Sequence, residues 1–341
     1  MNLPTSVARV LNIPGIPMTI ILIAAVIVFQ ILNPIFLSPD TLGNFMTNAA
    51  PILLLTLAVA IVIIGGGIDL SVGTVAGLSA GTTMFALVNG APLWLGIAVG
   101  ALTGLAFGLL NGILVAVFRI DDFIATLATL NIAAGLLVVL SQATLLQGVT
   151  TPGFAAITRG AIVGVPISFV VVAGLFLIAH LLLSKTVTGR KLYAIGVSSA
   201  ASNVAGVSVP RMRLFTFVIS GLLAGVAGVL LASRLGAVQA FLGIGYEFTA
   251  IAGAVVGGIA LAGGVGNVWA AFVGGLFLLT VQQGLRLNNV DPVYFSIVTA
   301  LAIVLGVIFD RQVRRVLLKG ALARTAAALA DRGTTTKVGA R

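Results

Sequence analysis

The sequence contains no cysteine, a single histidine (His180) and few charged residues. Without cysteine the chain has neither disulfides nor thiolate metal ligands, and one histidine excludes a histidine-cluster metal site. Charged residues make up 8% of the chain, whereas a typical soluble domain has about 25%. Because 60% of the residues are hydrophobic and the mean hydropathy is +1.23, the sequence predicts a polytopic membrane protein.

Several motifs with a known chemistry are also absent from the sequence. It has no G-x-x-x-x-G-K-[ST] loop for nucleotide phosphates, no H-E-x-x-H metal motif and no G-x-S-x-G nucleophile motif. We therefore expect no ATP bound through such a loop, no metal site and no enzymatic activity in this chain.

Apolar stretches of membrane-spanning length fill most of the sequence. A spanning helix needs about 20 apolar residues, and ten stretches qualify. The predicted fold class is all-α, with about ten transmembrane helices forming one domain over residues 1–309. The first span is predicted to be an uncleaved helix, since no convincing small-residue cleavage site follows it. The ten predicted spans are residues 17–36, 44–64, 71–89, 92–118, 123–145, 161–183, 214–233, 246–262, 268–285 and 293–309.

The basic residues, which give the chain a net charge of +10, are distributed unevenly about these spans. If the N-terminus is cytoplasmic and ten spans alternate, fifteen of the eighteen Lys and Arg residues lie inside. Lys and Arg accumulate on the cytoplasmic side of membrane proteins, so both termini are predicted to be cytoplasmic. The charges flank the spans and form no separate basic domain, which argues against nucleic acid as a partner. The three basic residues predicted outside are Arg159, Arg234 and Arg286.

Two polar segments fall on the predicted cytoplasmic side. Residues 310–341 form a basic tail, either a surface helix on anionic lipid or a frayed end. Residues 185–213 interrupt the apolar sequence with five basic residues and no acid. Small helix-forming residues in this second segment predict a short amphipathic helix, or a pair of helices, on the membrane face. The alternative is a solvated linker without a partner.

Two carboxylates fall within or beside predicted spans, where an ionisable group is costly and becomes a candidate for function. Asp69 lies in the stretch GGGIDLSVG, which predicts a helix break, and Ser71 can cap the helix that follows. Glu247 opens the short, glycine-rich eighth span, for which a re-entrant path is an alternative. The simpler interpretation of both carboxylates is an N-terminal helix cap.

Uncharged polar residues inside the spans form a second set of candidates, because such groups either hold helices together or line an aqueous path. A path for a neutral, hydroxyl-rich solute needs hydrogen-bond donors and acceptors but few charges. Most of the 42 glycines are expected to serve close helix packing instead. The polar candidates for a translocation path are Asn111, Thr126, Thr129, Asn131 and Gln282.

Four motifs give the chain a family resemblance that covers residues 36–310. It resembles the membrane permease subunits of bacterial ABC importers, in the branch that serves ribose, xylose and galactose, with branched-chain amino acid permeases as more distant relatives. Where this family usually shows Gly-Gly-Asn-Glu-like residues, the chain has Gly-Val-Ser-Ser at 196–199. The motifs are GGIDLSVG at 66–73, DFIATLATL at 122–130, TGRKLYAIG at 188–196 with the small residues after it, and EFTAIAGAVVGGIALAGGVGN at 247–267.

The resemblance implies a multi-pass protein of the bacterial inner membrane that works as a subunit of a larger assembly. The implied partners are a second permease subunit, a cytoplasmic ATPase and a periplasmic or lipid-anchored solute-binding protein. ATP and Mg²⁺ are expected on the ATPase, and this chain is expected to hold no cofactor. The basic loop would then dock on the ATPase. The residues expected in this coupling loop are Gly189, Arg190, Tyr193, Ala194, Ile195, Gly196, Ala200, Ala201 and Gly206.

The function predicted from the sequence is a permease that moves a monosaccharide, a ribose-like pentose or a hexose, by alternating access. Alternative solutes are a furanosyl signal molecule, a polyol, a nucleoside or a branched-chain amino acid. The rival class is an ATP-independent secondary transporter, which should carry ion-coupling carboxylates at mid-bilayer and have no need of a docking loop.

Overall fold

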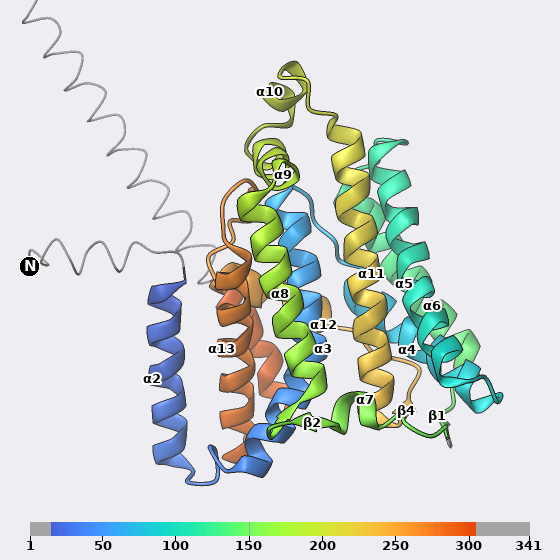
Figure 1. The fold of residues 1–341 in the computed structure, drawn as a ribbon, viewed down its shortest axis with the longest axis vertical. Coiled ribbons are helices and arrows are strands. Elements are labelled where there is room, and N and C mark those ends of the chain that lie inside the picture. The colour runs from blue at the N-terminus through green and yellow to red at the C-terminus, as the bar shows by residue number, and fades with distance from the viewer. Residues whose placement is uncertain (1–14, 150, 305–341) are drawn as a thin grey trace, which may run out of the picture.

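The computed structural model describes residues 15–149 and 151–304, and the predicted basic tail lies outside them. The described part is a bundle of helices with two very short β-sheets (Figure 1). The helices are α2 (Ile16–Leu32), α3 (Pro39–Ile64), α4 (Val72–Val88), α5 (Leu93–Ala116), α6 (Asp122–Ser141), α7 (Ala156–Arg159), α8 (Ile167–Lys185), α9 (Val187–Val197), α10 (Ser199–Val204), α11 (Val209–Leu235), α12 (Tyr246–Val256) and α13 (Val268–Leu287). An unlabelled helix, Val293–Val304, follows.

Six of the described helices, α3, α5, α6, α8, α11 and α13, are long and apolar enough to cross a membrane. This confirms an all-α polytopic membrane protein. Four shorter apolar helices, α2, α4, α12 and Val293–Val304, lie where the other four spans were expected. The count of ten spans and the cytoplasmic position of both termini remain predictions.

Two predicted boundaries are corrected by the structure. The sixth span was expected from residue 161, but residues 161–166 form a hairpin of β2 (Ala161–Ile162) and β3 (Val165–Pro166), and α8 begins at Ile167. The seventh span was expected from residue 214, but α11 begins at Val209, with Pro210 in its first turn, where a missing N–H costs nothing. Arg211 and Arg213 therefore lie on α11 and not in the preceding loop.

The break predicted at GGGIDLSVG is present. Helix α3 ends at Ile64, residues 65–71 are not helical, and α4 begins at Val72. Gly66 has φ +77°, a left-handed conformation that favours glycine. A second interruption follows α12, whose last helical residue is Val256, and continues to Asn267. The eighth span was expected to reach residue 262, so this second interruption shortens it. Each of the two irregular segments joins a full-length helix to a short one.

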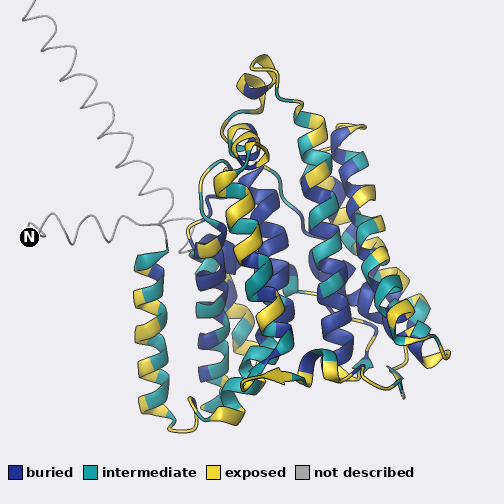
Figure 2. Ribbon diagram, viewed as in Figure 1, coloured by how far each residue is buried: buried dark blue, intermediate teal, exposed yellow. Residues whose placement is uncertain are grey.

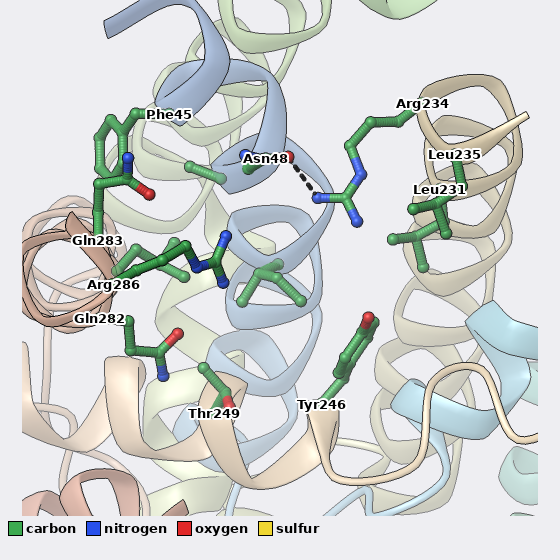
Figure 3. A pocket seen from close by; sticks show the side chains of 13 residues that line it. Phe45, Asn48, Leu231, Arg234, Leu235, Tyr246, Thr249, Gln282, Gln283 and Arg286 are labelled. Atoms are coloured by element: carbon green, nitrogen blue, oxygen red, sulfur yellow. Dashed lines mark hydrogen bonds between the residues drawn. The ribbon is translucent and has the colours of Figure 1, made fainter. Parts of the chain in front are cut away.

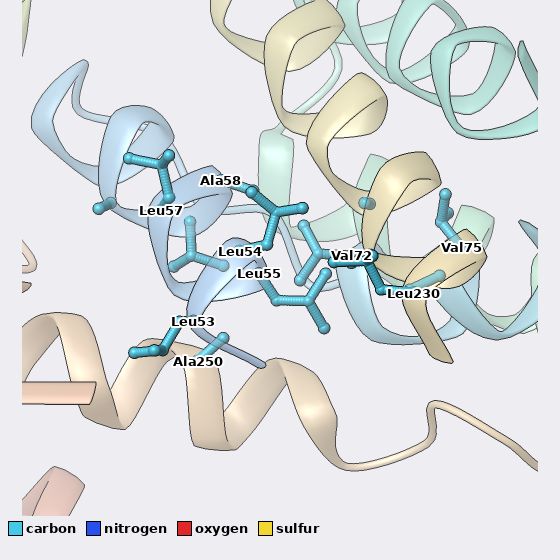
Figure 4. Packing of buried hydrophobic residues seen from close by; sticks show 14 of the residues in the cluster. Leu53, Leu54, Leu55, Leu57, Ala58, Val72, Val75, Leu230 and Ala250 are labelled. Carbon is cyan, nitrogen blue, oxygen red and sulfur yellow. The ribbon is translucent and has the colours of Figure 1, made fainter. Parts of the chain in front are cut away.

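The core is centred on α3. Every residue from Ala49 to Ile64 except Ile52 is buried, and a helix that is apolar all round is expected at the centre of a bundle. Figure 4 shows side chains of α3 packed against Val72 and Val75 of α4, Leu230 of α11 and Ala250 of α12. The outer helices expose large apolar side chains such as Ile31 and Val139, which suits contact with lipid (Figure 2).

Glycines allow α5 and α11 to pack with their backbones in contact. On α5, glycine occurs at every fourth position and so follows one face of the helix. A Cβ added at Gly104 would meet the backbone of Gly221 and Gly225 on α11. This is the small-residue packing that holds membrane helices together without a hydrophobic driving force. The glycines of the α5 series are Gly96, Gly100, Gly104, Gly108 and Gly112.

The two ends of the bundle carry different connections (Figure 1). One end holds α9 and α10 and is called the α9–α10 end. The other, called the α7 end, holds α7 and both sheets. There β1 (Leu146–Gln147) pairs antiparallel with β4 (Ala237–Val238), Leu146 opposite Val238.

Candidate functional site

The predicted helical pair of the polar loop is formed by α9 and α10. The Thr186 hydroxyl accepts a hydrogen bond from the Gly189 N–H (3.1 Å), and the Ser198 hydroxyl accepts one from the Ala201 N–H (3.2 Å). Each short helix therefore has a side-chain cap on an otherwise unpaired backbone donor. The predicted pair of short helices is therefore present, and docking of a partner on it remains a prediction.

Helix α9 is fixed to the rest of the chain at two places. The Tyr193 hydroxyl donates to the Gly266 carbonyl oxygen at 2.9 Å, and burial raises the pKa of this phenol, so it stays a protonated donor. A Cβ added at Gly196 would meet the Ile64 carbonyl oxygen and the Gly264 N–H. Helix α9 thus lies directly on the end of α3 and on the segment that follows α12. Tyr193 was expected in the coupling loop, and its hydroxyl is used within the chain.

The remaining coupling-loop candidates divide by exposure. Gly189 and Ile195 are buried against the chain. The outward surface of the pair carries small side chains, two cations (Arg190 and Lys191) and the exposed Val197 and Val204. The exposed candidates are Arg190, Ala194, Ala200, Ala201 and Gly206.

Four of the predicted path residues form one buried hydrogen-bonded network. Asp69 Oδ1 accepts from the Ser71 N–H (3.0 Å) and hydroxyl (2.7 Å), and Asp69 Oδ2 accepts from the Ser220 hydroxyl at 2.8 Å. Asn111 Nδ2 donates to the Ser71 hydroxyl at 2.9 Å, and the Thr129 hydroxyl donates to Asn111 Oδ1 at 2.7 Å. The network ties the 65–71 break to α5, α6 and α11 inside the bundle. Sequence reasoning missed Ser220, which lies 151 residues from Asp69 and in no motif.

A second carboxylate supports the same break from outside this network. Asp122 Oδ2 accepts the Ile68 N–H at 2.6 Å. Asp122 falls in the motif at 122–130 and in the first turn of α6, and sequence reasoning missed its contact with the break. The backbone of the break is therefore held by one acid within it, Asp69, and by one from α6, Asp122.

Glu247 lies apart from both acids, at the first turn of α12. Its Oε1 accepts the Gly245 N–H at 3.1 Å, which is the capping role expected from the sequence. Its Oε2 is buried without a hydrogen-bond partner among the described residues. A Cβ added at Gly73, in the first turn of α4, would meet this oxygen and the backbone of Gly243. The N-terminal turns of the two short helices thus meet inside the bundle.

The other polar candidates lie in three different environments. Thr126 is buried, and its hydroxyl donates to the Asp122 carbonyl oxygen one turn back. Asn131 is exposed on α6 and donates to the Leu127 carbonyl oxygen. Gln282 faces a cavity and donates to the Thr299 hydroxyl at 3.3 Å.

The cavity beside Gln282 has a volume of about 330 Å³ and lies between α3, α11, α12 and α13 (Figure 3). The cavity lies at the α7 end of the bundle. Arg234 and Leu235, the last two residues of α11, are in its lining, and α11 ends there. Two arginines, Arg234 and Arg286, enter it from different helices. The distribution of basic residues predicted both arginines on the non-cytoplasmic side of the membrane. It did not predict that they line the same cavity. Among residues 15–149 and 151–304 no group of three His, Cys, Asp or Glu side chains is placed to hold a metal ion.

Comparison with known proteins agrees with the architecture. Residues 41–307 match the family model described as "Branched-chain amino acid transport system / permease component". The ribose import permease protein RbsC of Bacillus subtilis is 36% identical over 288 residues, 84% of this chain and 89% of that protein. The autoinducer 2 import system permease protein LsrC of an Enterobacter species is 36% identical over 289 residues, 84% of each chain. The L-arabinose transport system permease protein AraH of Escherichia coli is 35% identical over 246 residues, 72% of this chain and 75% of that protein. No solved structure matches the chain.

Proposed function

The chain belongs to the family of branched-chain amino acid transport system permease components, and we propose that it is the permease subunit of an ABC importer for a monosaccharide. The relatives named for ribose and L-arabinose import support a sugar, and they span most of the chain. The observation that carries the coupling mechanism is the packing of α9 onto the chain's two irregular segments.

The proposed mechanism begins at the α9–α10 pair. A cytoplasmic ATPase, which binds ATP and Mg²⁺, docks on the exposed small residues around Ala200 and Ala201. Its motion is passed inward through the Tyr193 hydrogen bond to Gly266 and the close contact of Gly196 with Ile64. These contacts bear on the segment after α12 and on the start of the 65–71 break. Interruptions in membrane helices are where backbone rearranges around a path, so this coupling can alternate access.

The buried network around Asp69 serves as the rigid support of this movement. Its polar groups satisfy one another, and a satisfied buried network specifies one arrangement. We assign Asp69, Ser71, Asn111 and Thr129 to positioning the break, and Glu247 to the meeting point of α4 and α12. The solute path runs beside them toward the cavity that Gln282 lines.

The proposed assembly places the chain in the bacterial inner membrane with a second permease subunit. The α9–α10 end faces the cytoplasm, and a periplasmic or lipid-anchored binding protein delivers solute at the α7 end. This orientation follows from the basic residues, of which Arg190 and Lys191 belong to α9.

The docking step is tested with Ala201→Trp. Ala201 is exposed at the start of α10, so an indole there blocks a close-fitting partner without disturbing the core. The variant should insert normally, lose at least 10-fold in co-purified ATPase, and lose solute uptake in proportion. Ala155→Trp is the matched control for docking, because Ala155 is also exposed but precedes α7 at the other end; it should retain as much ATPase as the unmodified protein.

Normal ATPase retention and uptake by Ala201→Trp would show that the partner binds elsewhere. Equal loss in both variants would point to a general folding defect and would also contradict the assignment.

A further inference from the structure

The cavity at the α7 end has a positively charged lining. Among residues 15–149 and 151–304, its lining contains two arginines and no aspartate or glutamate. Arg234 and Arg286 are also two of the three basic residues that the charge count places outside the membrane. Lys and Arg are depleted on the non-cytoplasmic side of membrane proteins. Two arginines in one cavity on that side therefore indicate a functional role.

Arg234 is only partly satisfied within the chain. Its Nη1 donates to Asn48 Oδ1 at 2.7 Å (Figure 3), but its Nε is buried and has no partner among the described residues. A buried donor on a cation is costly to leave unpaired. The guanidinium has a planar set of donors that matches a carboxylate with two parallel hydrogen bonds. The Nε is enclosed by protein, so an anion in the cavity can reach only the Nη side of the Arg234 guanidinium.

Arg286 supplies the second cation from the opposite wall. It projects from α13 toward the same space (Figure 3), and its guanidinium carbon lies 5.7 Å from the centre of the Phe295 ring. That aromatic contact holds the side chain while its N–H groups remain free of any carboxylate in the lining. Two guanidiniums on facing helices create a positive potential that a bound anion would neutralise.

The rest of the lining suits a small hydroxylated solute. Gln282, Gln283, Thr249 and Tyr246 present amide and hydroxyl groups, which donate and accept hydrogen bonds. Leu231 and the neighbouring apolar side chains form a surface for C–H groups. A volume of about 330 Å³ lies at the small end of ligand cavities and fits one molecule of monosaccharide size.

We propose that this cavity binds a carboxylate-bearing monosaccharide, so that the transported solute is a sugar acid and not a neutral sugar. The carboxylate binds the Nη side of Arg234 and lies near the charge of Arg286, and the amides and hydroxyls hydrogen-bond the sugar hydroxyls. The inference rests on the proposed function, because it names the class of solute that the permease carries.

The test compares D-galacturonate with D-galactose, which differ only in a carboxylate in place of the C6 hydroxymethyl group. Binding to the full chain in lipid nanodiscs is measured calorimetrically at neutral pH and fixed ionic strength. D-Galacturonate should bind at least 10-fold more tightly than D-galactose, which corresponds to about 1.4 kcal/mol. Acetate, which has the charge but no hydroxyls, should bind more weakly than D-galacturonate.

The variants Arg234→Gln and Arg286→Gln should each remove most of the preference for D-galacturonate. Arg286 is exposed, so Arg286→Gln should fold. It therefore tests the preference for D-galacturonate even if Arg234→Gln does not fold. Arg159→Gln is the matched control, since Arg159 is exposed on α7 at the same end but outside the cavity; it should leave binding unchanged.

Equal binding of the two sugars that neither cavity variant alters would overturn the inference and leave a neutral-sugar path. Acetate binding as tightly as D-galacturonate would show a simple anion site and also overturn it. Absence of binding by all three probes would reject the cavity as a solute site. The arginines would then be assigned to binding acidic side chains of the delivery protein. None of these measurements needs the ATPase, so failure here is distinguishable from failure of the docking test.

Discussion

Replacing Gly108 on α5 by alanine tests how closely α5 and α11 pack. A Cβ at Gly108 would lie 2.5 Å from the Phe217 carbonyl oxygen and 2.9 Å from Gly221 Cα. Both contacts are with backbone, which no side-chain rotation can relieve. The helices must separate, and separation also weakens the dispersion contacts of the neighbouring glycines.

The expected magnitude combines two opposing effects. Overpacking of a tight core costs about 1–3 kcal/mol, while alanine improves intrinsic helix propensity over glycine by about 1 kcal/mol. Gly135→Ala isolates the propensity effect, because Gly135 lies in the middle of α6 with no atom within 4 Å of an added Cβ. The two variants share the propensity gain, so their difference of about 1–3 kcal/mol is the steric cost alone.

The assay is thermal unfolding of the two purified variants in the same detergent, followed by intrinsic fluorescence. Gly108→Ala should unfold several degrees below Gly135→Ala, and Gly135→Ala should equal or exceed the unmodified protein. Equal midpoints for the two variants would refute the close packing of the glycine series. Gly104→Ala, which meets the backbone of Gly221 and Gly225, should repeat the loss.

Two further predictions concern the break and the orientation. Asp69→Asn should keep most folding and uptake, because an amide oxygen still accepts from Ser71 and the amide nitrogen can donate to Ser220. Asp69→Leu should lower the yield of folded protein, because it leaves buried donors unpaired at a cost of about 1–3 kcal/mol each. Loss of uptake by well-folded Asp69→Asn would mean that the charge itself is required. Reporter fusions at Thr188 should report the cytoplasm and fusions at Thr151 the far side, and a periplasmic signal at Thr188 would reverse the proposed orientation.

The sequence alone determined the class of the protein and the linear position of its parts. Long apolar runs predict membrane spans, because a helix that crosses the bilayer needs a fixed length of apolar side chains. The break at GGGIDLSVG and the short helices after Lys185 could also be predicted. Clusters of glycine and of charged residues indicate where a membrane helix is interrupted. These signals depend only on neighbours in the chain.

Tertiary structure alone decided which side chains meet. Spans that are apolar on every face give no period from which to read the direction of a polar residue, so the contact of Asp69 with Ser220 had no sequence signal. Tyr193 reads as an exposed aromatic in a polar loop, yet packing directs its hydroxyl to Gly266, 73 residues away. Arg234 and Arg286 lie on helices separated by α12 in the chain, and only the packing of the bundle directs both guanidiniums into one cavity.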